Sequence, residues 1–241
     1  MKISAVLCVL ALCGLMPVVN AQTDNQQDQS FKRIISKEVS AKFVLSLPKD
    51  YAKNKKQKWP LVMFLHGSGE RGDDLAKVKV HGPPKLAAKG KDFPFILISP
   101  QCPENEWWNN ETLNALLDTI VEKYRVDESR IYCTGLSMGG FGTWSLAIQF
   151  PKRFAAIAPL CGGGDTRQVH KIAKVPVWCF HGAKDTSVPI EEDQKMVDQL
   201  KKDGGNVKFT IYPEASHDCW TETYDNPEFY EWLLAQSKPK E

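Results

Sequence analysis

The chain has 241 residues, of which 42% are hydrophobic, and its 31 basic side chains nearly balance its 29 acidic ones. A length and composition of this kind are typical of one globular domain of ordinary size. The net charge of +2 provides no strongly basic surface, so we do not expect nucleic acid as a partner. The sequence has no internal repeat that would predict a repeat architecture.

The first 21 residues differ in composition from the rest of the chain. Lys2 precedes an apolar run over residues 3–19, and small side chains follow as far as Ala21. This pattern predicts a cleavable secretory signal over residues 1–21, and therefore a secreted or periplasmic protein that no membrane holds after cleavage. An uncleaved membrane anchor is the alternative, although the run is short for a bilayer span.

Residues 22–30 are polar and contain no apolar side chain that could fasten them to a core. We therefore expect a flexible linker over residues 22–36. The remaining residues, 37–241, show no shift in composition and are expected to form a single domain.

Five cysteines follow the expected signal, and this odd number excludes complete pairing within the chain. Cys133 and Cys179 lie inside apolar runs, where buried free thiols are expected. Cys102 and Cys219 fall in loops, and a disulfide between them remains open. The sequence does not assign a state to Cys161.

Short apolar runs alternate with helical patterns from residue 39 onward. Strands are expected at residues 39–47, 60–65, 95–99, 130–134, 154–160, 175–180 and 207–212. Helices are expected at residues 112–124 and 138–150, around 196–200, and at 228–235. Continuous apolar runs of this length mark strands that are buried on both faces of a parallel sheet. The pattern predicts an α/β fold, a mostly parallel central sheet with helices on both faces.

The segment Gly135-Leu136-Ser137-Met138-Gly139 lies between an expected strand and an expected helix. A Gly-x-Ser-x-Gly sequence in this context predicts a nucleophile elbow, a tight turn that exposes the serine hydroxyl. The two glycines are needed because a Cβ atom would collide with the neighbouring strand or helix. The same pattern also arises by chance, so the rest of the chain must supply the other catalytic groups.

A catalytic serine requires a base and an acid, and Asp185 and His217 are the candidates. Each follows an expected strand, and the carboxyl ends of parallel strands gather at one edge of a sheet, where ligands bind. The order Ser137, Asp185, His217 is that of an α/β-hydrolase. Asp165 and Asp218 remain alternative acids.

The other histidines fit the role of the base less well. His66 and His181 each precede a glycine at a strand end, where hydrogen bonds to neighbouring loops are the expected role. His170 comes before the acid loop and His81 before the nucleophile, which is the wrong order for this fold.

The segment His66-Gly67-Ser68-Gly69 follows the second expected strand. Its glycines allow a sharp turn, so the Ser68 and Met138 amides are expected to form an oxyanion hole. An ordinary glycine turn is the alternative. Asp73 and Asp74 have no histidine at ligand spacing, so we expect neither a metal nor a cofactor.

Together these segments resemble secreted α/β-hydrolases of the carboxylesterase, phospholipase and predicted-peptidase group, which overlaps dienelactone-hydrolase-like and polysaccharide-esterase sequences. The resemblance covers residues 39–234, and it is carried by residues 66–72, 99–103, 135–140 and 181–185 and by His217. It implies the α/β-hydrolase fold and a serine hydrolase over residues 37–241. It implies little about the substrate.

The expected activity is hydrolysis of carboxylic esters through an acyl-enzyme. Only residues 161–174 separate the fifth and sixth strands, which excludes a large lid domain there and predicts an open site for bulky or polysaccharide-linked esters. Trp107 and Trp108 are candidates for an aromatic wall that holds a sugar or aryl group, with core packing or loop anchoring as the alternative.

Two other functions stay open from the sequence. A serine peptidase of the same fold is one, although such enzymes usually need an added domain to select peptides. A binding module without catalytic activity is the other. The acyl group, the alcohol and the oligomeric state are not predicted.

Overall fold

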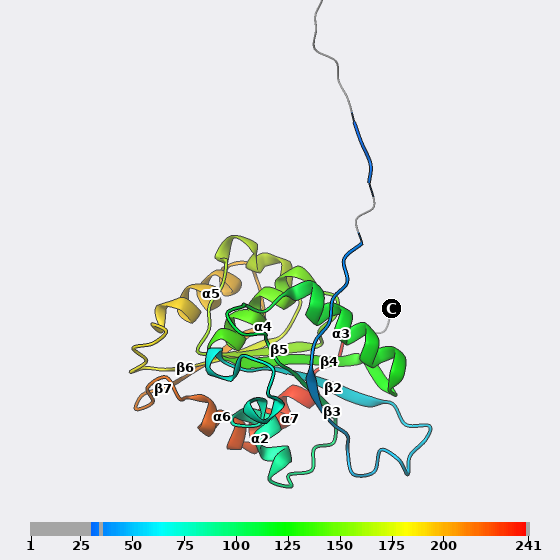
Figure 1. The fold of residues 1–241 in the computed structure, drawn as a ribbon. Coiled ribbons are helices and arrows are strands. Elements are labelled where there is room, and N and C mark those ends of the chain that lie inside the picture. Colours follow the sequence, from blue (N-terminus) through cyan, green and yellow to red (C-terminus); the bar gives the residue numbers. More distant parts are fainter. Residues whose placement is uncertain (1–29, 34–35, 240–241) are drawn as a thin grey trace, which may run out of the picture. The chain divides into compact units, whose positions relative to one another are not determined.

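The structure is a computed structural model that describes residues 30–33 and 36–239 (Figure 1). The chain divides into two compact units at Lys37, and the described residues of the first unit form neither helix nor strand. The expected signal at residues 1–21 lies outside the described residues, as does most of the expected linker. No described helix is long and apolar enough to cross a bilayer.

The second unit is built on a sheet of seven strands in the order β1-β3-β2-β4-β5-β6-β7. These strands are β1 (Phe43–Ser46), β2 (Trp59–Leu65), β3 (Ile96–Pro100), β4 (Val126–Leu136), β5 (Ala156–Leu160), β6 (Val177–Gly182) and β7 (Val207–Tyr212). Only β1 is antiparallel to its neighbour in this sheet. The predicted, mostly parallel sheet is therefore confirmed, with β1 at one edge.

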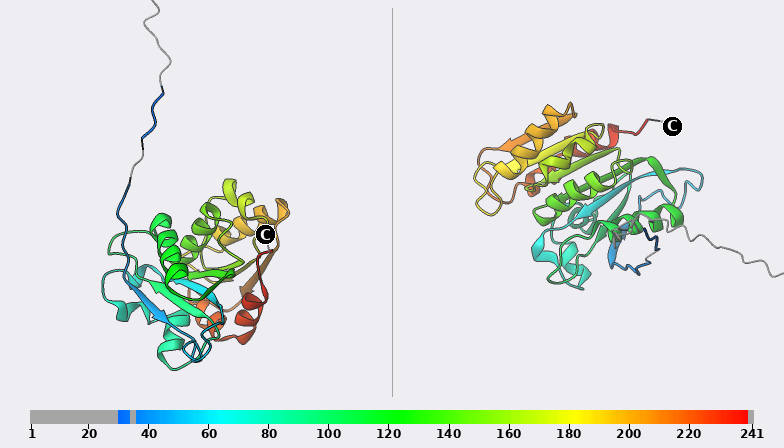
Figure 2. Two further views of the ribbon diagram at one scale, coloured as in Figure 1. Left: turned by 90° about the vertical axis from the view of Figure 1, so that its right-hand side faces the viewer. Right: turned by 90° about the horizontal axis from the view of Figure 1, so that it is seen from above.

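Helices cover both faces of the sheet, as predicted (Figures 1 and 2). One face carries α3 (Asn110–Lys123), α4 (Met138–Gln149), α5 (Glu191–Lys202) and the 3-10 helix η2 (Thr166–Ile172). The other carries α2 (Gly82–Ala88), α6 (Trp220–Asp225) and α7 (Pro227–Ala235). Two single-turn helices, η1 (Ser68–Glu70) and α1 (Leu75–Val78), follow β2. The short helices were not predicted, because one or two turns are too few for a helical period to show.

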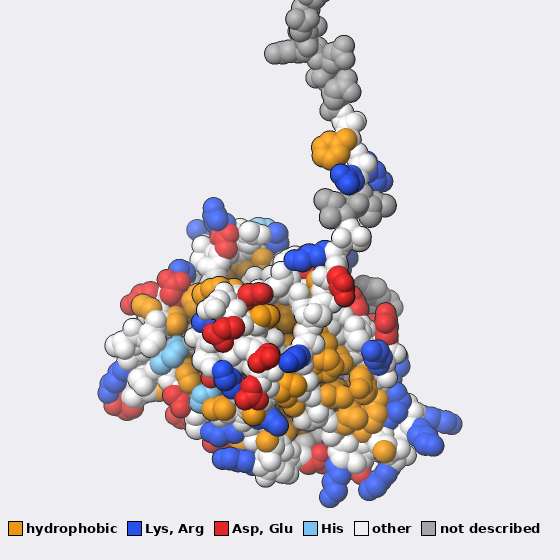
Figure 3. Space-filling model, viewed as in Figure 1, with side chains coloured by type: hydrophobic (Ala, Val, Ile, Leu, Met, Phe, Trp, Pro, Cys, Tyr) orange, Lys and Arg blue, Asp and Glu red, His pale blue; other side chains and the backbone are white. Residues whose placement is uncertain are grey.

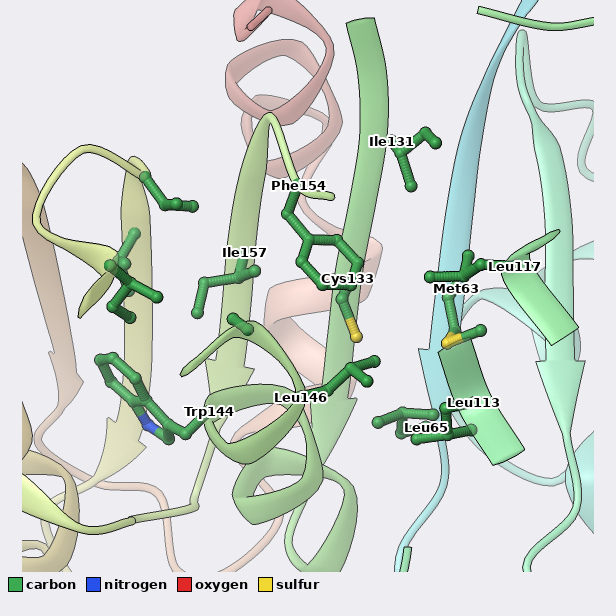
Figure 4. Close-up of a cluster of buried hydrophobic side chains, with 14 of the residues drawn as sticks. Met63, Leu65, Leu113, Leu117, Ile131, Cys133, Trp144, Leu146, Phe154 and Ile157 are labelled. Atoms are coloured by element: carbon green, nitrogen blue, oxygen red, sulfur yellow. The ribbon is translucent and has the colours of Figure 1, made fainter. Parts of the chain in front are cut away.

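Alternate side chains of β2 enter two separate cores. Leu61, Met63 and Leu65 lie in the cluster beneath α3 and α4, whereas Val62 and Phe64 lie in the cluster beneath α2, α6 and α7. This alternation follows from the pleat of a strand that is buried on both faces. Figure 4 shows the first cluster, in which side chains of α4 meet those of β4 and β5.

Parallel strands place the loops that follow β2, β4, β6 and β7 at one edge of the sheet. The connection between β5 and β6 holds only η2, so this part of the chain carries no large lid domain. On the face shown in Figure 3, acidic and basic side chains are interspersed.

Candidate active site

Ser137 occupies the tight turn between β4 and α4. Its φ and ψ of 54° and −119° place a non-glycine residue in a strained conformation, which the surrounding packing must hold. The Ser137 amide donates to the Leu160 carbonyl at 2.9 Å, which ties the turn to β5. A Cβ atom at Gly139 would lie 2.0 Å from the Leu65 carbonyl oxygen, so glycine is required where α4 crosses β2.

Three side chains from separate loops form one hydrogen-bonded series. The Nε2 atom of His217 lies 2.9 Å from the Ser137 Oγ atom, and its Nδ1 atom lies 2.6 Å from the Asp185 Oδ2 atom. When Nδ1–H donates to the carboxylate, Nε2 is left to accept the serine proton. The structure therefore brings together the serine, acid and base that the sequence predicted.

Asp185 is buried in the loop that follows β6. Its Oδ1 atom accepts hydrogen bonds from the Ser187 amide at 2.8 Å and the Val188 amide at 2.9 Å. Burial is the largest influence and raises its pKa, but the hydrogen bonds from His217 and these amides together hold the pKa below its ordinary value. Asp185 is thus a carboxylate at neutral pH.

His217 is only partly buried, and its pKa is raised above its ordinary value of 6.5. The first cause is a hydrogen bond with Cys161. Burial opposes the shift, and the Asp185 carboxylate adds to it. The imidazole is therefore poised to gain a proton.

The two alternative acids have other partners. Asp165 is the N-cap of η2, where it accepts from the Arg167 amide and pairs with the Arg167 guanidinium at 2.9 Å. Asp218 accepts from the amide and the hydroxyl of Thr221, both at 2.9 Å. Among the described residues, neither carboxylate makes a hydrogen bond to His217.

The loop after β2 lies against the elbow. A Cβ atom at Gly67 would be 3.6 Å from the Ser137 Cβ atom, and the Gly67 amide donates to the Glu70 carboxylate at 2.9 Å. Ser68 begins η1 and Met138 begins α4. The first amides of a helix have no acceptor within that helix, so both amides are suited to bind an oxyanion.

His66 holds this loop, in the role that the sequence predicted. Its Nε2 atom accepts from the Cys102 amide at 3.0 Å, and its Nδ1 atom lies 2.6 Å from the Gly67 carbonyl oxygen. Burial, the main cause, lowers its pKa to about 4. A neutral imidazole with one donor and one acceptor fits these partners.

His181 lies behind the acid and faces only acceptors. Its Nδ1 atom is 2.9 Å from the Asp193 Oδ2 atom, and its Nε2 atom is 2.9 Å from the Val188 carbonyl and 3.4 Å from the Asp185 Oδ2 atom. Burial is the largest influence and lowers its pKa, but Asp193 and the Val188 carbonyl raise it to about 9. His181 is therefore an imidazolium, hydrogen-bonded on both sides.

Asp193 was not identified from the sequence. It is fully buried on α5, and it also accepts from the Trp144 indole and the Gly162 amide, both at 2.8 Å. Its position in the sequence could have identified it as buried, since an aspartate three residues before Met196 lies on the apolar stripe of the helix. A buried carboxylate of this kind requires partners.

The two tryptophans after β3 differ in their surroundings. Trp107 is 64% exposed and makes an edge contact with Phe141, one helical turn beyond Ser137, at a centroid distance of 6.1 Å. Trp108 is partly buried, packs on His66, and donates from its indole nitrogen to the His66 carbonyl at 3.3 Å. Trp108 therefore supports the loop that bears Ser68.

One aromatic residue near the base, Trp220, was missed because α6 is short. Trp220 packs edge-on against His217 at 5.1 Å, and His81 also packs edge-on against Trp220, at 5.5 Å. His81 also lies 3.8 Å from the Glu70 carboxylate. His81 precedes the nucleophile in the chain, but the fold places it beside Trp220, which contacts His217.

One cluster among the described residues has the composition of a metal site. Potential ligand atoms of Cys161, His181 and Asp185 lie within 4.8 Å of one another. Both His181 nitrogens and both Asp185 oxygens already take part in hydrogen bonds. A metal would have to displace these bonds, so the donor set does not fit one.

The sheet order, the elbow and the loops at its carboxyl edge define an α/β-hydrolase. Residues 103–228, more than half of the chain, match the model of the dienelactone hydrolase family. The chain belongs to this family.

Relatives and solved structures agree with this fold. The chain is 26% identical over 168 residues to "Probable feruloyl esterase C" of Aspergillus terreus, which covers 68% of this chain and 62% of that protein. A solved thermostable esterase has 37% identity and a TM-score of 0.69, covering 81% of this chain and 59% of the other. The acylaminoacyl peptidase of Pyrococcus horikoshii has 16% identity and a TM-score of 0.60, covering 87% and 42%. This chain thus spans less than two thirds of the length of each.

Proposed function

We propose that this protein is a serine hydrolase that cleaves carboxylic esters through an acyl-enzyme. The observation that carries the proposal is the continuous series of hydrogen bonds from Ser137 through His217 to Asp185. Such a series activates a hydroxyl that is otherwise a weak nucleophile.

In the proposed mechanism, the Ser137 Oγ atom attacks the ester carbonyl carbon while its proton passes to the Nε2 atom of His217. The Ser68 and Met138 amides stabilise the negative charge on the carbonyl oxygen. The tetrahedral intermediate then expels the alcohol, which takes the proton from His217. Asp185 keeps Nδ1 protonated and stabilises the transient imidazolium.

Water completes the cycle. His217 removes a proton from a water molecule, which attacks the acyl carbon and forms a second tetrahedral intermediate held by the same two amides. This intermediate releases the carboxylic acid, and Ser137 regains its proton. The reaction requires no cofactor.

We infer that the substrate is a bulky ester, with feruloyl groups linked to a polysaccharide as the favoured class. Three observations support this: the connection after β5 has no lid domain, Trp107 offers an exposed aromatic surface against Phe141, one helical turn beyond Ser137, and a relative is named a feruloyl esterase. An aromatic acyl group can pack on an exposed indole, whereas an open site accommodates an attached polymer.

A substrate panel tests the proposal. The purified protein is assayed with p-nitrophenyl acetate, methyl ferulate, a feruloylated arabinoxylan and an acylated peptide anilide. We expect hydrolysis of the three esters and little release from the anilide. Cleavage of the anilide alone would favour the peptidase, and no turnover of any substrate would favour a binding module.

Labelling identifies the nucleophile independently of the substrate. A fluorophosphonate should modify Ser137, which mapping would find in the tryptic peptide that begins at Ile131. A label on any other residue would contradict the assignment.

We also propose that residues 1–21 direct export, because the charged start, apolar run and small residues fit a cleavable signal. Amino-terminal sequencing of the exported protein should begin at or next to Gln22. An intact Met1 on cytoplasmic protein would contradict export.

A further inference from the structure

Two cysteines from distant parts of the chain meet beside the proposed base. The Sγ atoms of Cys161 and Cys219 lie 2.7 Å apart, although 58 positions separate the residues, and both side chains are fully buried. This distance is shorter than the usual distance between two sulfur atoms that are not bonded to each other. We propose that Cys161 and Cys219 form a disulfide bond that fastens the His217 loop to the end of β5.

The backbone on both sides of this pair is already held in place. Cys161 directly follows Leu160, whose carbonyl accepts the Ser137 amide, and the Cys161 amide donates to the Phe180 carbonyl at 2.9 Å. The Cys219 amide donates to the His217 carbonyl, also at 2.9 Å. A bond between the sulfurs would therefore connect the segment that supports the nucleophile to the segment that bears the base.

The other described cysteines have no such arrangement. The thiol of Cys102 lies 3.5 Å from the Glu106 carbonyl, and that of Cys133 lies 3.8 Å from the Thr143 hydroxyl. The sequence left open a pairing of Cys102 with Cys219. The structure places Cys161 next to Cys219 instead, because the loops after β5 and β7 converge at the carboxyl edge of the sheet.

Oxidation requires a disulfide oxidant, of the glutathione or protein-disulfide class, through thiol–disulfide exchange. The Cys161 thiolate attacks one sulfur of the oxidant and releases one thiol. The Cys219 thiolate then attacks the mixed disulfide, so the chain loses two protons and two electrons and the oxidant becomes two thiols.

The timing of this reaction follows from burial. Because neither sulfur is accessible in the folded protein, the oxidant must react before the His217 loop has closed over the pair. For the same reason, a reductant should act slowly on the folded protein and rapidly on the unfolded chain.

Peptide mapping tests the bond without any substrate. The purified protein is refolded with oxidised and reduced glutathione, unfolded in the presence of iodoacetamide, and digested with trypsin. We expect one linked species that joins the peptide of residues 154–167 to the peptide that begins at Phe209, and both peptides separately after reduction. Alkylation of both Cys161 and Cys219 without reductant would overturn the proposal, as would a zinc ion retained with these two thiols free.

Variants test the same bond by its effect on stability. Cys161→Ala, Cys219→Ala and the double variant should each lower the melting temperature of oxidised protein by about 10 °C, with no additional loss in the double variant. Cys102→Ala removes another buried loop thiol and serves as the matched control, which should keep the linked peptide. Fully additive losses in the double variant would contradict a shared bond.

The consequence for catalysis rests on the proposed function. Protein refolded with reductant should hydrolyse esters with a lower kcat and a nearly unchanged KM, because the His217 loop is less restrained. If the linked peptide is found but no ester is hydrolysed, the proposed function fails and the disulfide stands. If esters are hydrolysed but both thiols are free, the disulfide fails and the proposed function stands.

Discussion

The Nδ1 atom of His217 lies 2.6 Å from the Asp185 Oδ2 atom, in a place where the Asp185 side chain is completely buried. Two amides hold the other carboxylate oxygen, so Asp185 cannot rotate without losing both hydrogen bonds. The acid is thus fixed before any substrate binds, which is the form of preorganisation that a catalytic base requires.

Replacement of this acid is the first prediction. Asp185→Asn should lower kcat for esters by about 10³ to 10⁴, because the asparagine amide favours the wrong imidazole tautomer. Asp165→Asn and Asp218→Asn are matched controls and should change kcat by about tenfold or less, since each carboxylate bonds elsewhere. Steady-state kinetics decides the matter, and an active Asp185→Asn beside an inactive control would show that the acid is misassigned.

The pH dependence of kcat/KM should report the protonation of His217. The general base must be neutral, and in protein whose cysteines are reduced the pKa of His217 is raised above 6.5 by Cys161 first and by Asp185 as well. Activity should therefore fall as the pH decreases, with a midpoint above 6.5. A profile measured with methyl ferulate tests this, and a midpoint below 6.5 would contradict it.

The imidazolium of His181 should make stability depend on alkaline pH. Its pKa in the folded state is about 9, above the ordinary 6.5, so its contribution is fully present below 6.5 and is lost as the pH rises through about 9. The melting temperature should decline over this range. A double variant with His181→Gln and Asp193→Asn carries a neutral pair and should decline less. An equal decline in wild-type and variant protein would exclude His181 as the cause.

The elbow should not tolerate a methyl group at Gly139. A Cβ atom there meets backbone of β2 at 2.0 Å, and backbone cannot move aside as a flexible side chain can. Gly139→Ala should cost about 3 kcal/mol or more in the free energy of unfolding. Gly69→Ala is the control, because a Cβ atom at Gly69 has nothing within 4 Å. Urea denaturation of both variants would show the difference, and similar midpoints would contradict it.

The two tryptophans should have separable effects. Trp107→Ala should raise KM for feruloyl esters roughly two- to tenfold, because the substitution removes the exposed indole surface. It should leave kcat and the hydrolysis of p-nitrophenyl acetate unchanged. Trp108→Ala should lower the melting temperature and the kcat for both substrates, because the Trp108 indole donates a hydrogen bond to the His66 carbonyl. Identical kinetic changes in the two variants would be inconsistent with these roles.

Much of the architecture was predictable because it depends on local patterns. The apolar run that became β2 is buried along its whole length, as a strand covered on both faces must be. The elbow around Ser137 combines a strand, a glycine-flanked serine and a helix within a few residues. The order along the chain selected Ser137 and His217, whereas Asp165 and Asp218 stayed open beside Asp185 as the acid until the structure placed Asp185 next to His217.

Other relationships were decided only by the tertiary structure. Cys161 meets Cys219, and Asp193 meets His181, because strand order and helix packing bring together loops that no sequence spacing connects. The surroundings of Trp107 and Trp108 differ for the same reason, since adjacent side chains point to solvent and to the core. The periodicity of apolar residues determines which face of a helix or strand is buried. The residues that cover a given side chain depend on how the helices and strands pack. That packing decides which polar side chains are hydrogen-bonded and which are charged.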